Sequence, residues 1–143
     1  LDLATGQVSA RVLEAALPGE FPQWDPRFTG RATRYIYANG IRENGTDGFF
    51  NAIQKLDTET GETAVHDLGP GRFTSEAMFI PAGPEEGDGY LGAVVYDARE
   101  HRSEMVLLDA RSPDLVQVAR VPLRNHVPFG FHCGYVAESF LPA

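Results

Sequence analysis

Cysteine is nearly absent from this sequence of 143 residues, which contains only Cys133. A single thiol excludes an internal disulfide framework and any zinc site built from several cysteines. One unpaired cysteine is typical of a reducing compartment, and we expect a cytoplasmic protein.

Basic residues and long apolar runs are also scarce. The chain has 12 Lys and Arg against 20 Asp and Glu, which gives a net charge of -8. Nucleic-acid phosphates attract clustered Lys and Arg, so this balance argues against nucleic-acid binding. No apolar run approaches the about 20 residues that a transmembrane helix requires. The composition leaves a globular protein with small-molecule or protein partners.

Turn-forming residues are abundant, with 15 glycines and 10 prolines. They separate short segments rich in Val, Ile, Tyr and Phe, the pattern of strands joined by turns. The segments predicted as strands are 34–38, 49–56, 63–67, 75–80, 90–97, 104–109 and 115–121. The sequence therefore predicts an all-β fold.

A short repeat divides the chain. The pattern L-D-x-x-T-G-x6-L starts at Leu1 and again at Leu56, and a weaker copy starts at Leu108. A period near 50 residues among strands is typical of propeller blades, each a four-stranded sheet. Residues 8–17 also show apolar residues at helical spacing, but the repeat predicts a strand over residues 7–13 instead.

Three polar residues follow the repeat at a constant interval. Glu76 lies 56 residues after Glu20, and His132 lies 56 residues after Glu76. Successive blades are related by rotation, so these side chains are expected to converge on one axis. A metal-bound histidine usually donates its second ring N–H to a carboxylate, and this trio fits such a site. The alternative is a hydrogen-bonded core histidine and two unrelated surface glutamates.

Three motifs resemble signatures of the carotenoid cleavage oxygenases, a family that includes lignostilbene dioxygenases and bacterial apocarotenoid oxygenases. The motifs are EFPQWDPRFTG at 20–30 followed by YIY at 35–37, VHDLGPGRF at 65–73 followed by SEAMFIP at 75–81, and VPFGFH at 127–132. They occur in the family's order and cover nearly the whole chain.

This resemblance implies part of a seven-bladed β-propeller whose axis holds a non-haem Fe(II) on four histidines. His132 resembles the last iron ligand, and Glu20 and Glu76 resemble glutamates that hydrogen-bond ligating histidines. The other three ligands are expected upstream of Leu1. Residues 1–143 are then the C-terminal part of one propeller domain, roughly two to three blades, and Fe(2+) is expected only in the intact protein.

The sequence departs from the family at Cys133, where a glycine usually follows the last ligand histidine. Its side chain either crowds His132 or fills a gap, and we do not expect it to bind iron. We interpret His66 and His101 as surface residues and His126 as a rim residue.

Two aromatic residues of the last motif, Phe129 and Phe131, are candidates for the wall of a substrate cavity. Aromatic side chains at such positions more often form the core between blades, and this alternative stays open.

The resemblance implies oxidative cleavage of a carbon–carbon double bond by O₂, which gives two carbonyl products. The expected substrate is a hydrophobic alkene, namely a carotenoid, an apocarotenoid or a stilbenoid. This stretch alone is expected to be inactive. The alternatives are a non-catalytic propeller fragment that binds a partner, and a truncated chain whose open blade edges pair with another copy. Membrane contact is left open.

Overall fold

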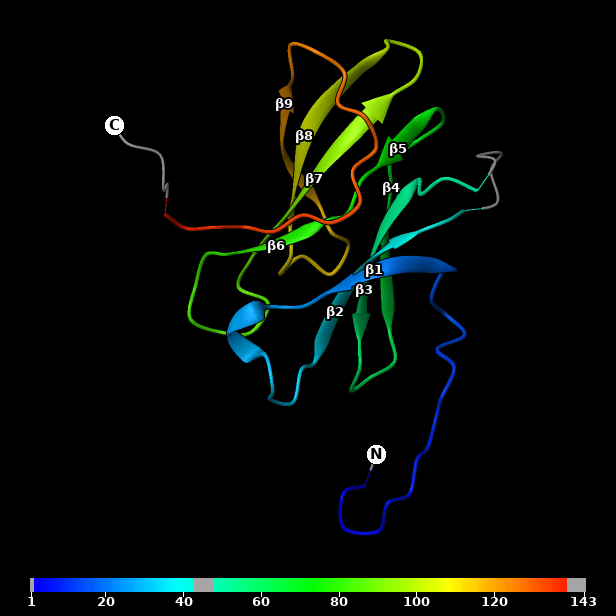
Figure 1. The fold of residues 1–143 in the computed structure, drawn as a ribbon, viewed down its shortest axis with the longest axis vertical. Coiled ribbons are helices and arrows are strands. Elements are labelled where there is room, and N and C mark those ends of the chain that lie inside the picture. The colour runs from blue at the N-terminus through cyan, green and yellow to red at the C-terminus, as the bar shows by residue number, and fades with distance from the viewer. Residues whose placement is uncertain (1, 43–47, 139–143) are drawn as a thin grey trace.

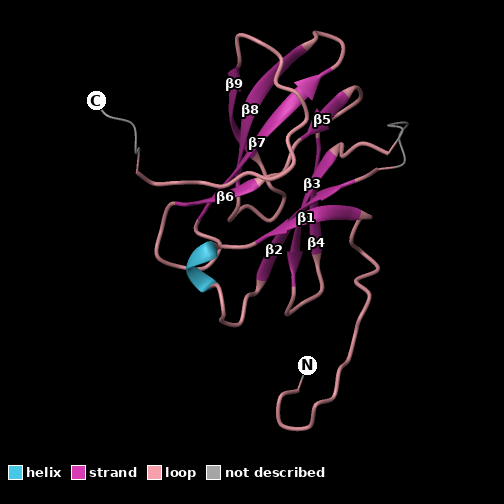
Figure 2. Cartoon of the chain, in the orientation of Figure 1, coloured by secondary structure: helices cyan, strands magenta, loops and turns pink. Residues whose placement is uncertain are grey.

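The computed structural model describes residues 2–42 and 48–138, which fold as two antiparallel sheets side by side (Figure 1). The only helical element in these residues is a single 3-10 turn, η1 (Pro26–Phe28), coloured cyan in Figure 2. No helix in the described ranges is long and apolar enough to cross a membrane. The all-β prediction is therefore confirmed.

The first sheet has the order β1-β2-β3-β4, with each strand antiparallel to the next. Its strands are β1 (Gly19–Gln23), β2 (Tyr35–Gly40), β3 (Ala52–Asp57) and β4 (Thr63–Asp67).

The second sheet has the same plan, but its first strand is broken. Its strands are β5 (Arg72–Thr74), β6 (Met78–Pro81), β7 (Gly89–Asp97), β8 (Arg102–Asp109) and β9 (Gln117–Pro122). Both β5 and β6 pair with β7, and β8 and β9 follow in order. Residues 75–77 interrupt the first strand, so Glu76 lies in the break. If β5 and β6 are counted as one broken strand, each sheet is a four-stranded antiparallel meander, as expected for a propeller blade.

One hydrophobic core joins the two blades. The rings of Tyr37 from β2 and Phe79 from β6 stack with their centroids 5.5 Å apart. Both belong to a single buried cluster that continues into β3, β7 and β8 through Ile53, Leu91 and Val106. Because both sheets contribute to this cluster, burial of apolar surface fixes one blade against the other.

Buried Asn39 adds a polar contact between the blades next to the broken strand. Its side-chain nitrogen donates to the Ser75 carbonyl at 3.1 Å, and its side-chain oxygen accepts from the Ala77 N–H at 3.2 Å. These bonds replace ladder partners that the break removes. Residue 76 is therefore held between two fixed neighbours.

The segment after β9 returns across the two sheets (Figure 1). The Val127 N–H donates to the Ser103 hydroxyl at 2.8 Å, and Phe129 stacks on Phe49 at 5.0 Å between centroids. This path carries residues 131–133 to the first blade and to the break that contains Glu76.

The prediction of a strand over residues 7–13 is wrong. A turn does form before this segment, since the Gly6 N–H donates to the Asp2 carbonyl at 2.8 Å. The residues that follow pair with no strand in the described part of the chain, and Val8 and Val12 are 77% and 84% exposed. A strand needs a ladder partner, which this segment lacks. Helical structure is not present there either.

Candidate functional site

The three evenly spaced residues lie around one open cavity of about 600 Å³. Residues 19–23 of β1 form one side of it, and Glu76, Phe131 and His132 line the rest. Glu20 is exposed in this cavity, whereas Glu76 is only 3% exposed. The structure therefore brings Glu20, Glu76 and His132 together, while their roles stay predictions.

A bulge in β1 shapes the cavity wall. Glu20 pairs with Asn39 and Gln23 pairs with Tyr37, so β1 has one extra residue between these pairs. Phe21 in the bulge has a φ of 58°, a left-handed conformation that is rare outside glycine. The extra residue lets both Glu20 and Gln23 line the same cavity.

Glu76 carries the densest set of polar contacts at the site. Its Oε1 accepts a hydrogen bond from Gln23 Nε2 at 2.6 Å, and its Oε2 accepts one from the Cys133 N–H at 2.5 Å. The same Oε2 lies 3.4 Å from Nδ1 of His132. A buried carboxylate is costly unless it is paired, and these donors remove that cost.

His132 is oriented by this carboxylate. Because Nδ1 faces Glu76, Nε2 is the ring nitrogen left for another partner. The His132 ring also packs edge-on against Phe131 at 4.6 Å and Phe21 at 5.5 Å between centroids. The side chain is nevertheless 68% exposed and therefore accessible.

The exposed Cys133 contacts Glu76 through its side chain as well as its backbone. Its Sγ lies 3.2 Å from the Glu76 carbonyl oxygen. Desolvation of the thiol, together with the charge and hydrogen bonding of Glu76, raises the pKa of Cys133 to about 11. The thiol is therefore protonated at neutral pH, and a thiolate ligand is not expected there.

The donor set fits one part of a metal site. Among the described residues, no group of three or more His, Cys, Asp or Glu side chains could hold a metal ion. His132 offers one neutral imidazole nitrogen backed by a buried carboxylate, which is the arrangement that metal-bound histidines usually have. These residues therefore fit one metal ligand, His132, and the carboxylate that supports it, Glu76.

The other histidines lie outside this cavity. His66 is not the surface residue that we predicted: it lies within β4, half-buried, and burial lowers its pKa. His101 is exposed in a turn, where its Nδ1 lies 2.7 Å from the Tyr96 hydroxyl. The exposed ring of His126 lies 4.7 Å from that of His101 between centroids.

The two aromatic candidates have different surroundings. Phe131 lines the cavity and packs on His132. Phe129 does not line it and instead contacts Phe49 and Phe73, at 5.0 and 6.3 Å between centroids.

Gln23 is the residue that the sequence analysis missed. Its position in the first motif, three residues after Glu20, gives no sign of its contact with Glu76, since the two residues are 53 positions apart. The contact depends on the bulge in β1 and on the packing of two blades.

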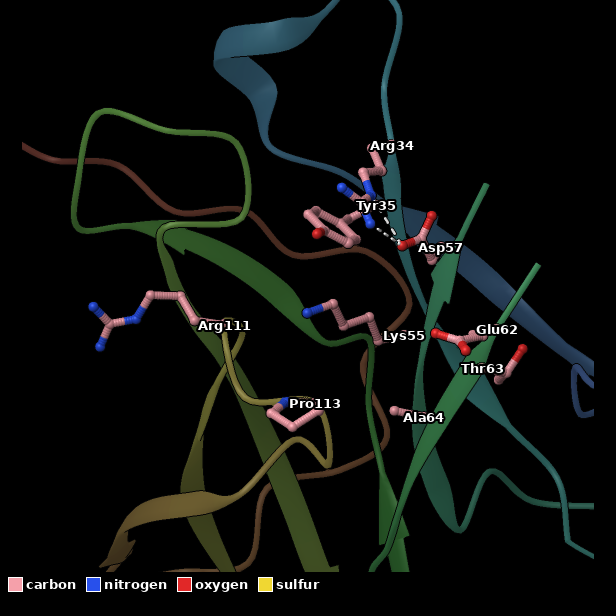
Figure 3. Close-up of a pocket in the computed structure, with 9 residues that line it drawn as sticks. All are labelled: Arg34, Tyr35, Lys55, Asp57, Glu62, Thr63, Ala64, Arg111 and Pro113. Atoms are coloured by element: carbon pink, nitrogen blue, oxygen red, sulfur yellow. Dashed lines mark hydrogen bonds and ion pairs between the residues drawn. The ribbon is translucent and has the colours of Figure 1, made fainter. Parts of the chain in front are cut away.

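A second pocket, shown in Figure 3, holds charged side chains that already have partners. Arg34 binds Asp57 at 2.8 Å, and Arg111 lies 3.2 Å from Asp109. Lys55 donates to the Ala110 carbonyl at 2.7 Å. Because these contacts pair the three cations and Lys55 links the two blades, we interpret this pocket as structural.

Known proteins are similar to this chain over nearly its whole length. A profile of the RPE65 family, described as retinal pigment epithelial membrane protein, matches residues 1–137. A carotenoid 9,10(9',10')-cleavage dioxygenase 1 from Phaseolus vulgaris is 34% identical over 154 aligned positions, which cover 98% of this chain and 28% of that protein. The apocarotenoid-15,15'-oxygenase of Synechocystis is 35% identical over 115 positions, covering 79% of this chain and 24% of that protein.

Solved structures agree with the sequence relatives. The cobalt-substituted Synechocystis apocarotenoid oxygenase superposes with a TM-score of 0.82 at 32% identity, over 92% of this chain and 28% of that one. A chimera of that oxygenase and RPE65 gives a TM-score of 0.84 at 30% identity, over 95% of this chain and 29% of that one. The chain thus spans about a quarter of the length of these relatives. It belongs to the RPE65 family of carotenoid cleavage oxygenases, and its two sheets are part of a β-propeller.

Proposed function

We propose that this chain contributes His132 as one ligand of a non-haem Fe(II) dioxygenase. The proposed enzyme cleaves a carbon–carbon double bond of a carotenoid, apocarotenoid or stilbenoid with O₂ and gives two carbonyl products. The single observation that carries the proposal is the placement of His132 Nδ1 3.4 Å from the buried carboxylate of Glu76. Metal-binding histidines typically have this partner.

Glu76 holds the imidazole in its working orientation. Its negative charge makes the ring a better electron-pair donor, and its position 3.4 Å from Nδ1 favours a proton on that nitrogen, which leaves the Nε2 lone pair free. Glu20 faces the same cavity, where it is suited to accept a hydrogen bond from a ligating histidine outside this chain. Iron, when bound, supplies the centre at which O₂ is activated.

The apolar side of the cavity suits an alkene. Phe21 and Phe131 lie 5.5 Å apart between centroids and flank the imidazole. These rings exclude water from one side of His132 and present a surface for a hydrophobic chain.

The remaining ligands are proposed to lie in other blades of the intact protein. The described residues offer one imidazole at the cavity, and the chain covers 28% or less of the first two relatives. We propose, from the resemblance of the motif at 127–132 to the last motif of the family, that these residues are the C-terminal part of the propeller. We expect Fe(2+) binding and activity only in the intact protein, which we propose to be cytoplasmic.

Replacement of His132 tests this proposal. In the intact protein, His132→Ala is expected to lose most of the bound iron and all alkene cleavage, measured by elemental analysis and by product detection. His101→Ala is the matched control, because His101 is an exposed histidine outside the cavity. Wild-type iron content and turnover in His132→Ala contradict the ligand assignment. A folded wild-type protein that binds no metal at all favours a binding module instead.

A further inference from the structure

We propose that Gln23 is a positioning residue that acts on His132 through Glu76. This inference rests on the proposed function, since it concerns the same site. Gln23 lies in β1 of the first blade, and its Nε2 donates to Glu76 Oε1 in the second blade at 2.6 Å. An ionised carboxylate can only accept, so the contacting group must be the amide nitrogen.

The two oxygens of Glu76 have different partners. Oε1 accepts from Gln23, while Oε2 accepts from the Cys133 N–H and faces His132 Nδ1. The last torsion of a glutamate side chain is soft, so donors on one oxygen alone do not fix the plane of the carboxylate. A donor on each oxygen does fix it. Gln23 therefore determines where Oε2 points.

Removal of the Gln23 amide leaves Oε1 without its donor. Glu76 is 3% exposed, and a buried acceptor without a partner is unfavourable. The carboxylate then lowers this cost by tilting out of its plane so that Oε1 reaches water in the open cavity. This tilt moves Oε2 away from His132 Nδ1.

The neutral charge of Gln23 is part of this arrangement. A guanidinium or ammonium group at 2.6 Å would share the negative charge of Glu76 and weaken its effect on the imidazole. An amide fixes the carboxylate but leaves its charge to act on His132. The bulge at Phe21, with its φ of 58°, places Gln23 to make this contact.

The histidine tautomer reports this role directly. A hydrogen bond from Nδ1–H to Glu76 favours the tautomer that leaves Nε2 unprotonated. In the metal-depleted intact protein, at an alkaline pH where imidazoles are neutral, ¹⁵N NMR of labelled histidines is expected to show His132 mainly in this tautomer. The His132→Ala variant identifies its signal.

The test compares Gln23→Met with Gln117→Met. Methionine keeps the length of glutamine without its donor, and Gln117 is an exposed glutamine on β9. Gln23→Met is expected to give a mixture of His132 tautomers and to weaken binding of Co(II) about 10-fold, the lower end of the usual range for residues behind metal ligands. Gln117→Met is expected to match the wild type in both measurements.

A donor-restoring variant separates positioning from stability. Gln23→Arg again donates to Oε1 and fixes the plane of the carboxylate, so it is expected to restore the single tautomer even where the thermal midpoint differs from that of the wild type. It is not expected to restore the wild-type Co(II) affinity, because the guanidinium shares the charge of Glu76. A wild-type tautomer and wild-type Co(II) affinity in folded Gln23→Met overturn the inference. So does a mixture of tautomers in Gln23→Arg. If the wild type and His132→Ala bind Co(II) equally, the proposed function fails, while the tautomer measurement still tests Gln23.

Discussion

Truncation of Glu76 offers the sharpest test of the polar network at the break in the second blade. Glu76→Ala removes the acceptor of two hydrogen bonds, from Gln23 Nε2 and from the Cys133 N–H. Each donor that stays buried without a partner costs about 1–3 kcal/mol. Cys133 is exposed, so water can replace the carboxylate at its N–H. The expected loss in the free energy of unfolding is therefore that of one donor, the half-buried Gln23 amide, or about 1–3 kcal/mol.

Glu20→Ala is the matched control for this prediction. Glu20 lines the same cavity but is exposed, and exposed side chains without such contacts change stability by about 0.5 kcal/mol or less. Urea denaturation of both variants gives the two free energies, provided that the dependence on urea is the same. Equal and small losses in the two variants would refute the reasoning, because Glu76 would then hold no network together.

Three further measurements test the fold. A hydrogen bond from Arg34 lowers the pKa of Asp57 to about 2, below its usual 3.8. The pair therefore stabilises the folded protein above about pH 4, and this stabilisation is lost as the pH falls toward 2. Arg34→Met should remove this part of the acid dependence, which is small because solvent screens the exposed Arg34 side chain. The Tyr37 hydroxyl is buried without a hydrogen-bond partner among the described residues, so Tyr37→Phe should leave the thermal midpoint unchanged or raise it. A Cβ at Gly19 would overlap a backbone carbonyl of β2, so Gly19→Ala should lower the free energy of unfolding by about 1–3 kcal/mol. Gly130 has open space around it, so Gly130→Ala should not lower this free energy.

Much of the fold was predictable because the strands have a local signature. The segments 63–67 and 90–97 alternate and contain branched or aromatic residues, and both form strands at nearly these bounds. The repeat indicated four-stranded units, and the motifs indicated the family that the comparisons confirm. These features depend on neighbours in sequence, which a single sequence contains.

The errors arise where distant parts of the chain decide the structure. The predicted strand at 75–80 begins only at Met78, because residues 75–77 bond to Asn39 of the other blade. The segment 7–13 has a strand-like sequence but no partner strand in the described ranges.

Part of the candidate site was predictable from the sequence, and part was not. The interval of 56 residues placed Glu20, Glu76 and His132 around one cavity, since rotation relates the blades. Gln23 could not be found in this way, because its contact with Glu76 depends on a bulge and a packing angle that no interval encodes. The roles of these residues stay predictions until metal binding is measured.

The contacts of Asn39 bear on how such a protein can evolve. Blades look like modules that duplication could add, remove or exchange one at a time. Here, however, the backbone of residues 75–77 in one blade is completed by a side chain from the other. A second blade transplanted without its neighbour would leave the Ala77 N–H at the break without the partner that Asn39 provides. We therefore expect duplication or exchange to act on the two blades together rather than on one. Glu76, which lies in the break, would then be kept or lost with both blades.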